Sequence, residues 1–365
     1  GIPETSFEEV QGSPLMKISG AGSVFFIEPF EGKILFDSKK AGINTIESTN
    51  FLYESNGILI AGKLDSPLIV YVDMATGETK WKLQEDFGKI IAVNELSAGE
   101  ILIVTLFNNY KINSSDGKII WKNSVSKEAG QMAQMGALGN LMKAYAEKMT
   151  ENMNFDLHFY KPDGKDMFLI GSQTQEEKTT GSSTTIIYSN RYYAYNISDG
   201  SSIWEKPLEL NGKVGQVAFA ENGIIILPDD GNRTKINLYS YQTGEGQWGK
   251  KGNGITIKGG VYHYLRVPQG LLLITKSGDN SFIQLLDTKT GTIPYDKPQK
   301  IQGTVAGTVI LDKGIFYITT EELNILDPAS GELLFSKSVN TKPSLTTSTN
   351  DVIYLFDTKE DLVKM

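Results

Sequence analysis

One short phrase recurs along almost the whole chain and limits what it can fold into. An apolar run ends at an Asp, an Asn or a Ser; a Gly follows four residues later, and an aromatic residue four residues after that. The copies are Asp73, Gly77 and Trp81; Asn113, Gly117 and Trp121; Asn196, Gly200 and Trp204; Ser240, Gly244 and Trp248; Asp287, Gly291 and Tyr295; and Asp327, Gly331 and Phe335, with a weaker copy at Glu28, Gly32 and Phe36. Repeats with a period of this size indicate a solenoid or a propeller.

The chemistry of one copy predicts a β-hairpin. Residues before the turn are rich in Val, Ile, Leu and Tyr, which is a strand signature. Asp, Asn or Ser can accept hydrogen bonds from the backbone just downstream, and Gly supplies the positive φ of a tight turn. The second strand then carries the aromatic residue, which we expect to pack between neighbouring repeats. All four tryptophans of the chain occupy this position, so a structural role explains them.

The spacing of the repeats distinguishes the two architectures. The turn glycines 32, 77, 117, 200, 244, 291 and 331 follow one another at steps of 45, 40, 83, 44, 47 and 40 residues. Between hairpins lie two more strand-like runs, such as residues 90–96 and 101–107. Roughly four strands in every 40–50 residues is typical of a propeller blade rather than of a helical repeat.

At these residues the chain resembles the PQQ-like, or quinoprotein-type, β-propeller repeat family, whose motif is Ala-x-Asp-x-x-x-Gly-x-x-x-Trp. Ala194, Asn196, Gly200 and Trp204 match that motif nearly in full, whereas the other copies replace its Ala. The resemblance covers roughly residues 20–360. It implies an all-β propeller of four-stranded antiparallel blades in a single domain, residues 20–365, preceded by a flexible tether at residues 1–19.

The 83-residue step leaves the number of blades open. Residues 126–150 predict a helix, because an apolar stripe recurs there at helical period. Its members are Met132, Met135, Leu138, Met142, Tyr145 and Met149. We favour seven blades with a helix and hairpin inserted at about 123–170; in the alternative, the hairpin with Gly164 and Phe168 supplies an eighth. The terminal segments each resemble half a blade, so we expect N- and C-terminal strands to close the propeller.

Composition excludes several classes of protein. The 365 residues carry a net charge of −8, which argues against nucleic acid or an anionic membrane as a partner. No apolar stretch approaches the ~18 residues of a membrane span. Cysteine is absent, so neither a disulfide nor a thiolate site can form. The chain starts with Gly-Ile-Pro rather than with Met, so we expect that either a leader or an expression tag was removed. The resemblance implies that a precursor could carry a lipid anchor.

No catalytic or metal-binding residue is predicted. His158 and His263 stand far apart in the sequence, and a scattered pair does not indicate a zinc or copper site. Residues 161–166 and 228–233 hold closely spaced acids, but neither fits a twelve-residue calcium loop. Hairpin turns explain both segments.

The resemblance implies two functions. The first is a non-catalytic, monomeric scaffold that binds other envelope proteins, similar to the BamB-like group that assists outer-membrane protein assembly from the periplasm. The Met-rich stripe would then be a partner-binding element. The alternative is an oxidoreductase that uses pyrroloquinoline quinone and calcium, or a propeller that binds another small molecule. Many such enzymes use a vicinal disulfide, which a chain without cysteine cannot form, so we expect no cofactor.

Overall fold

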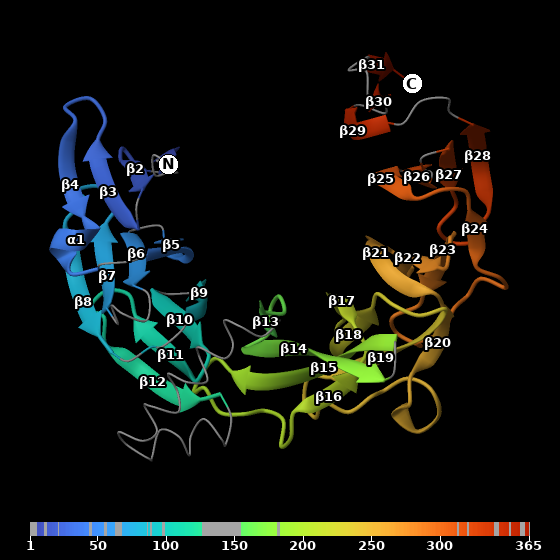
Figure 1. Ribbon diagram of the computed structural model, residues 1–365, viewed down its shortest axis with the longest axis horizontal. Helices are drawn as coiled ribbons and strands as arrows, with labels where there is room; N and C mark the ends of the chain where they lie inside the picture. Colours follow the sequence, from blue (N-terminus) through green and yellow to red (C-terminus); the bar gives the residue numbers. More distant parts are fainter. Residues whose placement is uncertain are drawn as a thin grey trace. The chain divides into compact units, whose positions relative to one another are not determined.

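The computed structural model shows an all-β chain (Figure 1). It describes residues 6–10, 13–20, 22–43, 46–54, 57–62, 68–85, 87, 90–96, 99–125, 155–180, 183–311, 314–319, 321–338, 343–349, 352–357 and 362–364. Within these ranges the strands form seven four-stranded sheets and one three-stranded sheet. Each sheet takes its strands in chain order, and the strands pair antiparallel, which is the topology of a propeller blade. The predicted fold class is confirmed.

The chain divides into two compact units, and the first unit is formed by residues 1–175 and 191–207. A single-turn helix, α1 (Ser38–Ala41), follows its first sheet. The sheets are β1 (Ser6–Glu9), β2 (Met16–Gly20), β3 (Ser23–Glu28) and β4 (Lys33–Asp37); β5 (Ile46–Glu54), β6 (Gly57–Gly62), β7 (Leu68–Asp73) and β8 (Thr79–Gln84); and β9 (Ile90–Leu96), β10 (Glu100–Thr105), β11 (Asn108–Asn113) and β12 (Ile119–Ser124).

The second unit is formed by residues 176–190 and 208–365. It holds a short 3₁₀ turn, η1 (Lys250–Gly252). Its sheets are β17 (Val214–Phe219), β18 (Gly223–Pro228), β19 (Arg233–Ser240) and β20 (Ile255–Lys258); β21 (Gly260–Val267), β22 (Gly270–Ser277), β23 (Asn280–Leu286) and β24 (Gln299–Ile301); β25 (Val305–Leu311), β26 (Gly314–Thr319), β27 (Glu322–Leu326) and β28 (Leu333–Ser338); and the three-stranded β29 (Pro343–Thr349), β30 (Val352–Asp357) and β31 (Leu362–Lys364).

A further sheet contains the longest strands that the structure describes. It consists of β13 (Phe155–Tyr160), β14 (Met167–Thr180), β15 (Ser183–Asn196) and β16 (Leu208–Asn211). β14 and β15 have 14 residues each. β13 pairs with β14 only from Leu169 to Thr174. The remainder of the hairpin formed by β14 and β15 therefore extends past β13.

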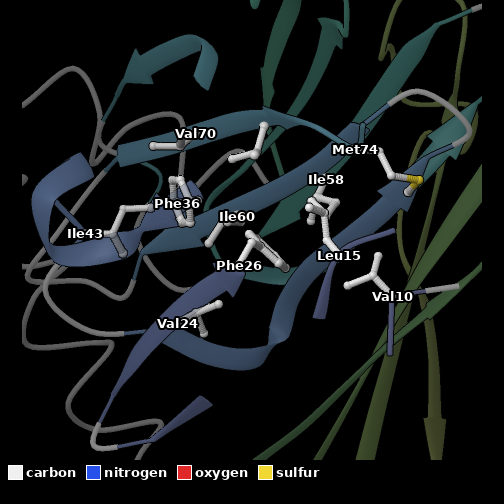
Figure 2. Close-up of a cluster of buried hydrophobic side chains, with 11 residues drawn as sticks. Val10, Leu15, Val24, Phe26, Phe36, Ile43, Ile58, Ile60, Val70 and Met74 are labelled. Atoms are coloured by element: carbon white, nitrogen blue, oxygen red, sulfur yellow. The ribbon is translucent and has the colours of Figure 1, made fainter. Parts of the chain in front are cut away.

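The cores lie between consecutive sheets. Figure 2 shows the first of them, where Val24 and Phe26 of β3 and Phe36 of β4 contact Ile58 and Ile60 of β6. Every residue of β6 is buried, because its alternate side chains enter different cores. Burial of each such side chain contributes about 1.5–3 kcal/mol to stability. Continuous apolar runs in the second strands are therefore required by packing on both faces.

The described backbone differs from the sequence-based expectation at the N-terminus. β1 and β2 lie in the range predicted to be a tether, and they pair with each other and then with β3. All four residues of β1 are exposed, which explains why its polar sequence did not predict a strand. This sheet thus has four strands from the N-terminal segment alone. Closure of the propeller by strands from both termini stays a prediction.

Two further predictions have separate outcomes. The helix predicted at residues 126–150 lies outside the described residues. The hairpin with Gly164 and Phe168 is not an addition to the repeats, because β13 and β14 are the first two strands of the sheet that ends at β16. Among the described residues, no helix is both long and apolar enough to cross a membrane.

Candidate functional surfaces

In six copies of the repeated turn, the glycine N–H donates to the carbonyl of the residue four positions earlier. At the copy after β7, Oδ1 of Asp73 accepts hydrogen bonds from the backbone N–H groups of Ala75 (2.8 Å) and Thr76 (2.9 Å). The N–H of Gly77 donates to the Asp73 carbonyl at 2.9 Å, and Gly77 has a φ of +72°. The bonds from Thr76 and Ala75 to the carboxylate, together with Lys80, lower the pKa of Asp73 to about 2. In this copy the acid accepts the downstream backbone bonds and the glycine supplies the positive φ of the turn.

Side chains near the end of one repeat contact the turn of the next repeat. A Cβ on Gly117 would lie 2.7 Å from the Trp81 ring, and the Trp81 indole N–H donates to the Ser114 carbonyl at 2.6 Å. A side chain at the turn glycine is therefore excluded by the aromatic ring above it. The same contact joins Leu35 to Gly77, Trp121 to Gly200, Trp248 to Gly291, and Tyr295 to Gly331.

This contact resolves the 83-residue step. Trp121 packs on Gly200, and its indole N–H donates to the Ile197 carbonyl at 3.1 Å. Trp121 therefore contacts Gly200 across the 83-residue step in the same way that Trp81 contacts Gly117 across a 40-residue step. Among the described residues, the sheet of Gly200 is therefore the next blade after that of Gly117.

The two acidic segments are hairpin connections, as predicted. Residues 161–166 join β13 to β14, with Gly164 at a φ of +67°. Residues 228–233 join β18 to β19, where Asp229 Oδ2 accepts a 2.7 Å bond from Lys213 Nζ. That bond raises the pKa of Lys213. The other carboxylate oxygen, Asp229 Oδ1, is buried without a hydrogen-bond partner in the described structure. The bond between Lys213 and Asp229 joins the residue before β17 to the connection after β18.

The histidines do not form a site in the part of the chain that the structure describes. His158 on β13 and His263 on β21 are both exposed. Within the described residues, no three His, Cys, Asp or Glu side chains are grouped as a metal ion would need.

An apolar surface is exposed on β28. All six of its residues are exposed, unlike those of β8, and the side chains of Leu333, Leu334 and Phe335 are 38%, 57% and 40% exposed. Phe335 holds the position of Trp81 in the repeat, yet Trp81 is only 9% exposed. We call residues 333–335 the β28 stripe. Clustered exposed apolar side chains mark a surface suited to another protein.

The long hairpin of β14 and β15 is a second exposed feature. Residues 176–180 and 183–187 are all exposed, including Ile186 (45%) and Ile187 (39%). We call these residues the ribbon. The sequence analysis did not predict it, although the run of β-branched and aromatic residues from Thr184 to Tyr188 is the signal that could have.

The sequence-predicted residues have two outcomes. Four of the predicted aromatic residues lie over the turn glycine of the next repeat, as described above, whereas Leu35 rather than Phe36 lies over Gly77, and Trp204 is buried. The Met-rich stripe lies outside the described residues. Its members are Met132, Met135, Leu138, Met142, Tyr145 and Met149.

Comparison with known proteins supports the repeat family over part of the chain. Residues 193–354 match the family model described as outer membrane protein assembly factor BamB. The resemblance to PQQ-like repeats is confirmed there, over less than half of the chain. No curated protein matches the sequence.

Solved structures resemble the chain weakly. BamB from Moraxella catarrhalis has 11% identity and a TM-score of 0.36, covering 98% of this chain and 95% of its own. Quinohemoprotein alcohol dehydrogenase from Comamonas testosteroni has 11% identity and a TM-score of 0.42, covering 97% of this chain and 72% of its own. The computationally designed Ika8 protein has 10% identity and a TM-score of 0.40, covering 100% and 96%. With TM-scores below 0.5 these likenesses carry no argument, and the sheets themselves define the fold class.

Proposed function

We propose that this chain is a non-catalytic scaffold that binds other proteins of the bacterial envelope and supports outer-membrane protein assembly from the periplasm. The family match at residues 193–354 supports the assembly role. It includes the sheets from β17 to β28, whose apolar side chains form shared clusters between consecutive sheets.

The β28 stripe is the observation that carries the scaffold function. β28 is the last strand of its sheet, so its edge and its exposed apolar side chains are both accessible in the described structure. Burial of Leu333, Leu334 and Phe335 against a partner would release their apolar surface from water, at about 25 cal/mol per Å². A small apolar patch of this kind fits a protein surface better than it fits a charged ligand.

Deletion of the gene tests the assembly role. We expect the folded fraction of outer-membrane β-barrel proteins, measured by heat-modifiable gel mobility, to fall several-fold in cells that lack the chain. Expression of the wild-type chain should restore it. Unchanged barrel folding after deletion would show that the proposed function is wrong.

A pair of matched substitutions tests the surface. Leu334→Asp places a charge in the β28 stripe, whereas Ile310→Asp places one at an equally exposed position on β25, at 56% against 57%. With both variants folded by circular dichroism, we expect Ile310→Asp to restore barrel folding and Leu334→Asp to fail. Equal restoration by both would exclude the β28 stripe as the contact.

The enzymatic alternative predicts a different result. Pyrroloquinoline quinone and Ca²⁺ added to the purified chain should change its visible spectrum and raise its thermal midpoint if the chain is a quinoprotein. The scaffold function predicts no change in either measurement.

A further inference from the structure

The ribbon extends past both strands that flank it. β13 pairs with β14 only as far as Thr174. On the other side, the Gly212 N–H after β16 donates to the Tyr188 carbonyl at 3.1 Å, and the Asn190 amide donates to the Leu210 and Gly212 carbonyls. No strand in the described part of the chain pairs with the outer edge of β15 at residues 183–187.

The bond from Gly212 also shows which backbone groups of that edge are free. In an antiparallel strand, alternate residues point their N–H and C=O to the same side. Because the Tyr188 carbonyl points away from β14, the N–H and C=O of Ile186 and Thr184 do so as well. The Thr184 and Thr179 hydroxyls lie 3.2 Å apart across the hairpin, as expected where opposite residues do not exchange backbone bonds.

The two edges of the ribbon differ in charge. The β14 edge carries Glu176, Glu177 and Lys178, and charges of this kind protect an edge strand from pairing. The β15 edge reads Ser-Thr-Thr-Ile-Ile over residues 183–187. It has no charge and no proline, and it is rich in β-branched residues, which favours addition of another strand.

Both faces of the ribbon are exposed. Ile186 and Ile187 point to opposite faces, because side chains alternate along a strand, and each is more than a third exposed. A two-stranded ribbon without a packed face is only marginally stable in water. Further strands would therefore stabilise it.

We propose that the β15 edge pairs with the same edge of a second copy of this chain, which makes a four-stranded ribbon across a two-fold axis. Thr185 lies opposite Thr185 of the other copy, and Thr184 lies opposite Ile186. This register joins only free backbone groups, in about four hydrogen bonds. A register centred on Ile186 would instead need the Tyr188 carbonyl, which Gly212 already occupies.

The second copy fits this edge by its chemistry. Every opposed pair is uncharged, and Thr opposite Thr or Ile is a stabilising cross-strand pair. The charged β14 edges become the outer edges of the joined ribbon, where they stop further addition. The paired segment is short and each chain has a net charge of −8, so the dimer is weak and dependent on concentration and salt. It differs from the monomer that the sequence predicts.

Sedimentation equilibrium on the full chain tests the dimer. We expect the wild type to shift from monomer towards dimer between roughly micromolar and millimolar concentrations. Ile186→Pro removes an outward N–H without removing a bond inside the hairpin, and it should weaken the dimer at least about tenfold. Thr179→Pro makes the same change on the β14 edge and should leave the dimer unchanged.

A charge exchange tests the register. Thr185→Lys and Thr185→Glu each place like charges opposite each other, so each variant alone should remain monomeric. An equal mixture of the two should associate, because the charges are then opposite. Wild-type chain that stays monomeric at the highest concentration, equal effects of the two proline variants, or a mixture that does not associate would overturn the proposal.

Discussion

Two joints between neighbouring blades show what holds the repeats together. In the first unit, Trp81 lies within β8, covers Gly117, and donates its indole N–H to a turn carbonyl. In the second unit, Trp248 covers Gly291 at closer range, with its ring 2.3 Å from where a Cβ would lie. Yet Trp248 lies outside any strand, and its buried indole N–H has no acceptor in the described structure.

The difference shows which part of the joint is essential. The backbone of Trp248 is placed by another bond, from its N–H to Oδ1 of Asn237 at 2.9 Å. The Trp248 ring is therefore held over Gly291 by a bond to its backbone, not by a bond to its indole. Contact between ring and glycine is common to both joints, whereas the indole hydrogen bond is not, so we infer that packing rather than hydrogen bonding defines the joint.

The largest expected effect comes from filling the space under the ring. Gly117→Ala would clash with Trp81 and place a side chain at a φ of +73°. Overpacking and the left-handed backbone together should lower the free energy of unfolding by about 2–5 kcal/mol. Urea unfolding followed by tryptophan fluorescence measures it.

Gly164→Ala is the matched control for that substitution. Gly164 has a similar φ of +67°, but its Cβ would meet nothing within 4 Å. Only the backbone cost of about 1–2 kcal/mol should remain. Equal losses in the two variants would mean that the ring contributes nothing to the need for glycine.

A smaller difference in stability is expected between substitutions of Trp81 and Trp248. Trp81→Phe leaves the Ser114 carbonyl without its donor, which should cost about 1–3 kcal/mol beyond the lost ring area. Trp248→Phe loses the ring area but breaks no indole bond. We expect Trp81→Phe to lower the thermal midpoint more, and the reverse order would contradict the inferred difference between the joints.

The smallest effect concerns acid stability at a single turn. The pKa of Asp73 is lowered from 3.8 to about 2 in the folded chain, so its carboxylate stabilises the fold above pH 3.8 and loses that contribution as the pH falls towards 2. Asp73→Asn keeps the oxygen acceptor, as Asn113 does in the next repeat, but cannot titrate. Urea midpoints between pH 5 and about pH 2 should fall less steeply for Asp73→Asn than for the wild type.

Much of the fold could be predicted because the signals are local. Asp73 and Gly77 specify a turn within five residues of chain, and the flanking apolar runs specify the strands around it. The strands β1 and β2 could not be predicted for the complementary reason: the exposed edge strand β1 carries no apolar pattern, and it pairs with β2, which in turn pairs with β3.

The candidate surfaces were less predictable. The ribbon at Thr184–Ile187 has the composition of any strand, and its lack of a neighbour depends on where β16 ends. The β28 stripe has the sequence of an ordinary repeat, and Phe335 stands where Trp81 does. Exposure of these side chains depends on which other parts of the chain pack on them. A repeat pattern in the sequence does not contain that information.

By itself the sequence determined the unit of construction, a four-stranded blade whose turn residues, glycines and aromatics act within or next to their own hairpin. Only the tertiary structure decided which blade follows which along the long step. Trp121 on Gly200 makes the 83-residue step a single blade step, and the side chains at residues 183–187 of β15 and on β28 are exposed in the described part of the chain. The physical reason is range: turn and strand preferences are set by neighbours in sequence, whereas burial and edge pairing are set by neighbours in space.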